Sequence, residues 1–166
     1  MASRAQQDPY PVQFDDEMAA FVTGGISITL ASRNAALVPS ISRAKGCRVL
    51  RGAAIRLRIF VSRSQAGDLL NDIRSIGAIS ATFTRPETHR TLQFKGTDAR
   101  VDAMNDEDRA ALAAARESFA VTIRPLGFSG DFARAFLGSD GDEVAIEFTL
   151  SDAFRQTPGP GAGERL

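Results

Sequence analysis

Apolar and polar residues alternate in several short runs of this chain, and this period of two constrains the fold more than any other feature. The clearest run is residues 53–62, AAIRLRIFVS, in which every second side chain is aliphatic and Arg56 and Arg58 fall on the opposite face. Successive side chains of a strand point to opposite faces, so such a run predicts a half-buried β-strand. We expect about six strands of this kind, lying within residues 26–31, 38–50, 53–62, 78–84, 90–102 and 142–150.

Other segments have the spacing of helices. Residues 62–77 carry apolar side chains three and four positions apart and stop at Gly77, which readily adopts the left-handed conformation that ends a helix. Residues 105–123 begin with a cap at Asn105 or Asp106 and continue with acids and many alanines, which predicts the longest helix. Two shorter helices are expected within residues 14–25 and 129–138.

These strands and helices do not alternate as they would in parallel βαβ units. Strands joined by short turns and interrupted by two longer helices predict an α+β, mainly β protein, built as an antiparallel barrel with helices over its openings. We expect residues 14–155 to form one domain. A polar arm, residues 1–13, would precede it, and a Pro/Gly-rich tail, residues 156–166, would follow it.

The charges of the chain cancel, with 20 Lys and Arg against 20 Asp and Glu, so there is no global field of the kind that attracts nucleic acid or acidic membranes. We therefore expect no nucleic-acid partner and no membrane partner, and any anion site must be local. No apolar run approaches the roughly 20 residues of a membrane span, and residues 1–13 lack the core of a signal peptide. The single cysteine fits a reducing compartment, so we expect a cytoplasmic protein.

One short segment concentrates possible cations. TRPETHRTLQFKG, residues 84–96, holds Arg85, His89, Arg90 and Lys95. An arginine beside a hydroxyl matches the oxygens of a phosphate, as Thr88 with Arg90 would, or Ser62 with Arg63. Either pair is also open to the interpretation of a helix cap or a surface ion pair. The strand that follows the turn would show Thr91, Gln93 and Lys95 on its polar face.

The order of these elements resembles the pyridoxamine 5′-phosphate oxidase-like superfamily of FMN-binding split barrels. Two segments carry the resemblance. ISITLASRNAALVPSIS, residues 26–42, is similar to the opening hairpin with a proline in its second strand, and GAISATFTRPETHRTLQFKGTDARV, residues 77–101, is similar to the fourth and fifth strands. The resemblance implies a six-stranded antiparallel split β-barrel flanked by helices, a homodimer, and FMN in a groove between the subunits.

The resemblance also implies site residues. Arg43 and Arg48 resemble an arginine of the second strand and a cation five residues later. Ser62 and Arg63 resemble the start of a Ser-Arg-Lys segment, with Ser64 in place of the lysine, and Arg90 and Thr91 resemble an Arg-Gln pair, with threonine in place of the glutamine. Together with the polar side chains near the turn, the candidate FMN site is Arg43, Arg48, Ser62, Arg63, Thr88, His89, Arg90, Thr91 and Gln93.

His89, the chain's only histidine, and Cys47, its only cysteine, are the remaining candidates for chemistry. A neutral imidazole nitrogen can hydrogen-bond a flavin ring, donate to a phosphate, or bind metal or haem iron, although a lone histidine in a loop more often has a surface role. One histidine and one cysteine do not make the three or four ligands of a zinc site, so no metal is expected. Cys47 lies within a strand, which predicts a buried structural cysteine rather than a nucleophile.

The resemblance implies a flavin-dependent oxidoreductase in which FMN reacts with a small organic substrate or electron donor. No residue has the pattern of an obligatory acid or base, so none is assigned as catalytic. The oxidase itself ends in a segment with a tryptophan, which this chain lacks, so pyridoxamine phosphate is not the expected substrate. The alternative is a non-catalytic flavin- or haem-binding or sensing module on the same fold, and a third reading is a dimeric scaffold without a cofactor.

Overall fold

The computed structural model describes residues 12–138 and 141–166. Within these ranges the helices are α1 (Asp16–Thr23), α2 (Gly67–Ile76), α3 (Asp106–Ile123), α4 (Gly130–Phe136) and a short 3-10 helix, η1 (Arg124–Leu126). The strands are β1 (Ser27–Arg33), β2 (Pro39–Ala44), β3 (Gly46–Leu50), β4 (Arg56–Ser62), β5 (Ile79–Thr84), β6 (Thr91–Gly96), β7 (Arg100–Ala103), β8 (Glu143–Thr149) and β9 (Asp152–Arg155).

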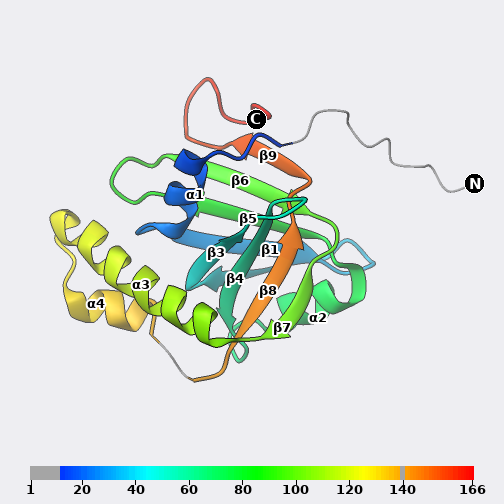
Figure 1. The fold of residues 1–166 in the computed structure, drawn as a ribbon, viewed down its shortest axis with the longest axis horizontal. Coiled ribbons are helices and arrows are strands. Elements are labelled where there is room, and N and C mark those ends of the chain that lie inside the picture. The colour runs from blue at the N-terminus through cyan, green and yellow to red at the C-terminus, as the bar shows by residue number, and fades with distance from the viewer. Residues whose placement is uncertain (1–11, 139–140) are drawn as a thin grey trace, which may run out of the picture.

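The strands form two sheets in which every pairing is antiparallel. One sheet has five strands in the order β2-β1-β5-β6-β9, and the other has four in the order β3-β4-β8-β7. Figure 1 shows the two sheets crossing each other, with α3 and α4 at one side and α2 at the other. The predicted fold class, an α+β split barrel with flanking helices, is confirmed, but the strands number nine rather than six.

Two predicted strands are each divided between the sheets. The run 38–50 breaks at Lys45 into β2 and β3, because the Lys45 side chain is buried and its Nζ donates to the carbonyl oxygen of Gly138. The run 90–102 breaks after Gly96 into β6 and β7, and Asp98 between them accepts a hydrogen bond from the Thr149 N–H at 2.8 Å. The ninth strand, β9, was not predicted, because only Ala153 among its four residues is fully buried.

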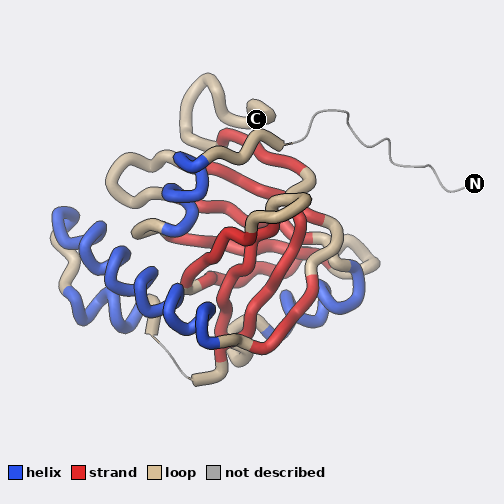
Figure 2. The backbone as a smooth tube through the Cα atoms, in the orientation of Figure 1, coloured by secondary structure: helices blue, strands red, loops and turns tan. Residues whose placement is uncertain are grey.

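The main core lies between the two sheets, and Figure 2 shows the strands together in the middle with the helices around them. Alternate residues of both sheets point into it, as the period of two predicted. Phe94 on β6 is fully buried, and its ring meets Phe83 and Phe14 edge-on, with ring centroids 5.7 and 5.6 Å apart. Burial of these large apolar side chains is the main force that holds the sheets together.

Side chains at their first turns fix the starts of two helices. Asp15 accepts a hydrogen bond from the Met18 N–H at 2.8 Å and caps α1, as predicted. Asn105 and Asp108 form a reciprocal capping box at the start of α3, which packs Leu112 against Phe60 of β4 on the outer side of the four-stranded sheet. No helix among residues 12–138 and 141–166 combines the length and the apolar character that a membrane span needs.

Both segments that flank the predicted domain contact it in the described part of the chain. Residues 1–11 of the predicted arm lie outside the described residues, while Val12 and Phe14 already pack on the main core. The tail folds back along β9 and β6. The N–H of Gln156 donates to the Thr91 carbonyl oxygen at 2.8 Å, and the N–H of Leu166 donates to the Ala153 carbonyl oxygen at 2.9 Å.

Candidate functional site

A row of hydroxyl groups crosses the outer face of the five-stranded sheet. Ser27, Thr84 and Thr91 are partners in neighbouring strands, and the hydroxyl oxygens of Thr84 and Thr91 lie 3.1 Å apart. Arg43 on the edge strand β2 donates from Nη1 to the Ser27 hydroxyl at 3.1 Å. The structure therefore brings Arg43 and Thr91, two of the predicted site residues, onto one face. Ser27 and Thr84 were not predicted, although their hydroxyls fall on the polar side of the period-two pattern.

Arg43 has no carboxylate partner among the described residues. Besides the Ser27 hydroxyl, its guanidinium contacts the face of the Phe136 ring on α4, 4.3 Å from the ring centroid. A cation over an aromatic face is attracted to the ring but keeps its full charge. Its side chain is exposed, so this charge is available to an anion.

Thr91 and Gln93 lie on the same strand and contact the tail. The Thr91 N–H donates to the hydroxyl of Thr157 at 3.0 Å, and the Gln93 amide oxygen accepts from the Gln156 amide at 3.3 Å. The tail therefore borders the hydroxyl row on the β6 side. The backbone and side-chain contacts give this part of the face a fixed position.

Two arginines of the turn before β6, Arg85 and Arg90, contact side chains of helix α1. Arg90 forms an ion pair with Glu17 at 2.8 Å and lies 4.8 Å from the centroid of the Phe21 ring. Arg85 approaches the same ring at 5.5 Å. A phosphate at Arg90 would therefore have to compete with the carboxylate of Glu17, and the role of Arg90 in cofactor binding stays a prediction.

Thr88 and His89 occupy the exposed tip of this turn. The Thr88 hydroxyl accepts a hydrogen bond from the Arg90 N–H at 3.3 Å, and the His89 N–H donates to the Arg85 carbonyl oxygen at 2.9 Å. His89 has a backbone φ of +57°, in the left-handed region that is uncommon for residues other than glycine. Its imidazole forms no hydrogen bond or ion pair with the other described residues, so its nitrogens are open to an external group.

Ser62 and Arg63 lie at the end of β4, where an internal carboxylate already collects the local donors. The Ser62 hydroxyl donates to Asp142 Oδ1 at 2.8 Å, and the Ser64 N–H donates to Asp142 Oδ2 at 2.7 Å. The N–H and hydroxyl of Ser64 and the hydroxyl of Ser62 lower the pKa of Asp142 to about 2. Asp142, which sequence reasoning missed, thus holds the hydroxyl that was expected to bind a phosphate. The Arg63 side chain is exposed.

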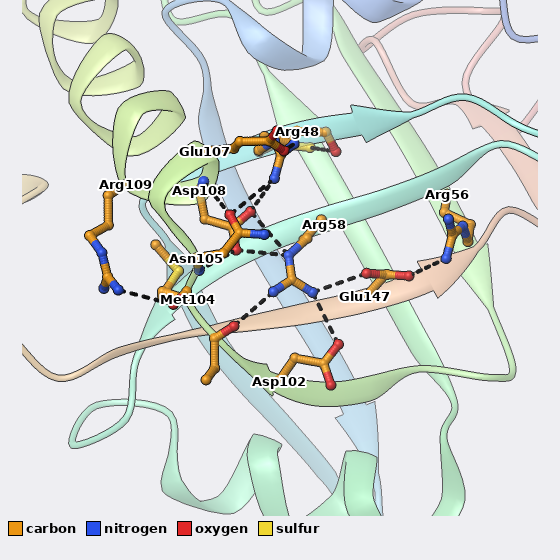
Figure 3. Close-up of polar contacts among 12 residues, drawn as sticks. Arg48, Arg56, Arg58, Asp102, Met104, Asn105, Glu107, Asp108, Arg109 and Glu147 are labelled. Carbon is orange, nitrogen blue, oxygen red and sulfur yellow. Dashed lines mark hydrogen bonds and ion pairs between the residues drawn. The ribbon is translucent and has the colours of Figure 1, made fainter.

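Arg48 belongs to a network of ion pairs between the four-stranded sheet and α3 (Figure 3). Its Nη1 donates to Asp108 Oδ1 at 2.6 Å, and its Nη2 pairs with Glu107. The structure does not bring Arg48 together with the hydroxyl row. Both terminal nitrogens of its guanidinium pair with carboxylates of α3. Arg48 thus differs from Arg43, which lies only five residues earlier in the chain.

Arg58 of β4 is the centre of this network. Its guanidinium bonds Asp108 of α3 at 2.9 Å, Asp102 of β7 at 3.0 Å and Glu147 of β8 at 3.0 Å. Arg58 shares the polar face of the alternating run with Arg56, and α3 covers this face at Arg58 and buries its side chain. Arg56 and Arg100 extend the network by ion pairs with Glu147, both at 2.6 Å. The buried charges are all paired, and the network joins all four strands of this sheet to α3.

The pKa of Asp108 lies below its usual range. Burial alone would raise it, but hydrogen bonds from the Asn105 N–H, Arg48 and Arg58 outweigh burial and favour the charged form. Burial likewise acts to lower the pKa of Arg58, and hydrogen bonds to Asp108, Asp102 and Glu147 reverse this and raise it. Both groups therefore stay charged in the folded protein at neutral pH.

Cys47 of β3 is buried, and burial raises the pKa of its thiol. A protonated thiol in the core is a poor nucleophile, so the predicted structural role fits its position. Among residues 12–138 and 141–166, no three His, Cys, Asp or Glu side chains are grouped so as to hold a metal ion.

Known proteins resemble this chain in three-dimensional structure but not in sequence. No protein-family model matches the chain, and no curated protein matches it in sequence. A tagged HupZ from Group A Streptococcus superimposes with a TM-score of 0.55 at 16% identity, covering 91% of this chain and 100% of HupZ. A single-substitution variant of HupZ superimposes with a TM-score of 0.52 at 15% identity, covering 86% and 98%.

A candidate pyridoxamine 5′-phosphate oxidase from Lactobacillus delbrueckii also superimposes on the chain. Its TM-score is 0.51 at 12% identity, and the match covers 85% of this chain and 93% of that protein. Such a likeness across almost the full length of both chains concerns the arrangement of strands and helices. The chain therefore shares its fold, an antiparallel split barrel with flanking helices, with these proteins.

Proposed function

We propose that this protein binds FMN and works as a flavin-dependent oxidoreductase on a small organic substrate. The observation that carries the proposal is the exposed guanidinium of Arg43, which lies without a carboxylate partner among the described residues, beside the hydroxyl row of the five-stranded sheet. A flavin, when bound, supplies the electron-transfer chemistry, and the protein supplies binding and orientation.

The donor set fits the phosphate of FMN in part. Arg43 offers a planar fork of N–H donors, and Ser27 beside it offers a hydroxyl, which together match a phosphate. Thr91 and Gln93 continue the polar face toward the tail and would hydrogen-bond the polar atoms of the cofactor. Arg48, Ser62 and Arg90 already hold carboxylates of this chain and would contribute less.

We propose that the protein is also a homodimer. The hairpin of β1 and β2 exposes Val38 and Ile41, with 56% and 71% of their surfaces accessible. A second copy that covered these neighbouring apolar side chains would remove them from water. Sedimentation equilibrium should give twice the mass of the chain, and the mass of a single chain would contradict the dimer.

Arg43→Ala should weaken FMN binding by about 1.5–3 kcal/mol, because it removes a charge-assisted hydrogen bond to the phosphate. This corresponds to roughly a tenfold to hundredfold rise in Kd. Quenching of FMN fluorescence on titration with the protein measures the affinity. Arg74→Ala, an exposed arginine of α2, is the matched control and should leave the Kd unchanged.

The same titration of Arg90→Ala compares the two arginines. Since Arg90 has Glu17 as its partner, we expect a smaller loss of affinity than for Arg43→Ala. Equal affinities of the wild-type protein and Arg43→Ala would remove Arg43 from the site. A larger loss of FMN affinity in Arg90→Ala than in Arg43→Ala would indicate that the phosphate binds at the turn before β6.

One observation favours a second candidate function, a non-catalytic haem-binding module. The exposed imidazole of His89 forms no hydrogen bond or ion pair with the other described residues and would be free to ligate haem iron. Addition of haemin separates the candidates. A Soret band that disappears in His89→Ala supports the haem module, whereas bound FMN that is bleached by a reduced nicotinamide supports the oxidoreductase.

A further inference from the structure

An open depression of about 480 Å³ lies at one end of the five-stranded sheet. Ala31, Ser80, Lys95 and Asp152 form its floor, and they are register partners in the neighbouring strands β1, β5, β6 and β9. The β1–β2 hairpin forms one wall. The volume falls within the range of about 300–1,000 Å³ that is usual for small-molecule sites.

Two cations line this depression without carboxylate partners. Lys95 and Arg33 form no ion pair with any residue in the described part of the chain. The Lys95 ammonium lies 4.8 Å from the centroid of the Phe154 ring, and Arg33 donates only to the carbonyl oxygen of Asn34, at 3.3 Å. Both contacts leave the positive charge uncompensated, so the lining attracts an anion.

The one carboxylate in the lining does not cancel these charges. Asp152 forms an ion pair with Arg165 of the tail at 3.0 Å and accepts a hydrogen bond from the Ser151 hydroxyl at 2.8 Å. The positive charge of Arg165 therefore balances the negative charge of Asp152. The depression keeps the charges of Lys95 and Arg33.

An apolar side chain completes the site. Leu37 lines the depression with 69% of its surface exposed and with a backbone φ of +64°. The Asn34 side chain holds the hairpin in this form by accepting the N–H groups of Ala36 and Val38 at 2.9 and 3.0 Å. A leucine in the left-handed region is a strained outlier of the kind that gathers at functional sites.

We propose that this depression binds a small organic anion with one carboxylate or phosphate group on an apolar body. The anionic group lies between Lys95 and Arg33, and the Ser80 hydroxyl on the floor offers a further donor. The apolar body packs on Ala31 and Leu37. This lining suits neither a cation nor a purely apolar molecule.

The site is separate from the hydroxyl row assigned to FMN. Thr91 opens β6 and Lys95 lies four positions further along, which is about 13 Å in an extended strand. Likewise, Ser27 begins β1 and Arg33 ends it. The proposal therefore stands whether or not the protein carries FMN, and its test uses flavin-free protein.

The test is isothermal titration calorimetry of the full chain with phenyl phosphate and, in parallel, with benzyl alcohol, its neutral analogue. We expect phenyl phosphate to bind and benzyl alcohol to bind at least tenfold more weakly. Lys95→Gln and Arg33→Gln should each weaken phenyl phosphate about tenfold, the worth of one charge-assisted hydrogen bond. Arg74→Gln, an exposed arginine outside the depression, should leave binding unchanged.

Four results would overturn the proposal. Benzyl alcohol that binds as tightly as phenyl phosphate would show an apolar site without anion recognition. An unchanged affinity for phenyl phosphate in both Lys95→Gln and Arg33→Gln would show that the depression is not the binding site. The absence of any heat of binding at millimolar phenyl phosphate would show that no such site exists. A loss in Arg43→Ala with none in Lys95→Gln would place the anion in the hydroxyl row instead.

Discussion

The free energy of unfolding of Asp108→Ala should be about 3–5 kcal/mol lower than that of the wild-type protein, as is usual when one partner of a buried ion pair is removed. The Asp108 side chain is fully buried and accepts hydrogen bonds from Arg58 Nε at 2.9 Å and Arg48 Nη1 at 2.6 Å. Without the carboxylate, the Arg58 guanidinium stays buried with fewer counter-charges. Urea denaturation followed by circular dichroism measures the change.

Asp106→Ala is the matched control for this experiment. Asp106 lies two residues earlier in the same helical turn, but it is fully exposed. Its exposed ion pair with Arg109 should be worth less than about 1 kcal/mol. Equal stabilities of the Asp108 and Asp106 variants would contradict the assigned role of the network.

The same carboxylate predicts how the stability of the wild-type protein depends on pH. Because the pKa of Asp108 is lower in the folded state than its unfolded value of 3.8, its contribution is complete well above pH 4. It is lost as the pH falls below that value and through the folded pKa. The urea midpoint should therefore drop less steeply between pH 5 and pH 2 in Asp108→Ala than in the wild-type protein, whereas parallel curves would exclude Asp108 as a source of the acid sensitivity.

Phe94→Ala should lower the free energy of unfolding by about 3–5 kcal/mol, because it leaves a cavity at the centre of the main core. The Phe94 ring is fully buried and meets both Phe83 and Phe14 edge-on. Phe128→Ala is the matched control, since this ring lies between η1 and α4 and is 44% exposed. A loss in Phe94→Ala no larger than that in Phe128→Ala would show that the core does not depend on this ring.

Much of the fold could be predicted because local chemistry decides it. The alternation of Leu57, Ile59 and Val61 marks the inner face of β4, and Asp15 and Gly77 mark the ends of helices. The division of two strands between the sheets was not predicted, because the groups that contact each break lie far away along the chain. At Lys45, the partners that hold the break are Gly138 and Glu143, about a hundred residues away along the chain.

The candidate site was harder to predict, because the partner of each cation lies far away in the sequence. Arg43 and Arg48 looked equivalent, yet Arg43 meets a hydroxyl and an aromatic ring whereas Arg48 meets Asp108 and Glu107. Arg58 lies on the polar side of an alternating run, and the sequence does not show that α3 covers this side chain and pairs it with Asp108. The sequence alone therefore does not show which charges are neutralised within the chain.

Titration of FMN with the purified full-length protein tests the central claim most directly. We expect its fluorescence to be quenched to saturation with one FMN per chain, and we expect the quenching to need a markedly higher protein concentration in Arg43→Ala than in the wild-type protein. Unquenched fluorescence at protein concentrations well above that of the flavin, in a protein whose circular dichroism shows a folded chain, would contradict FMN binding.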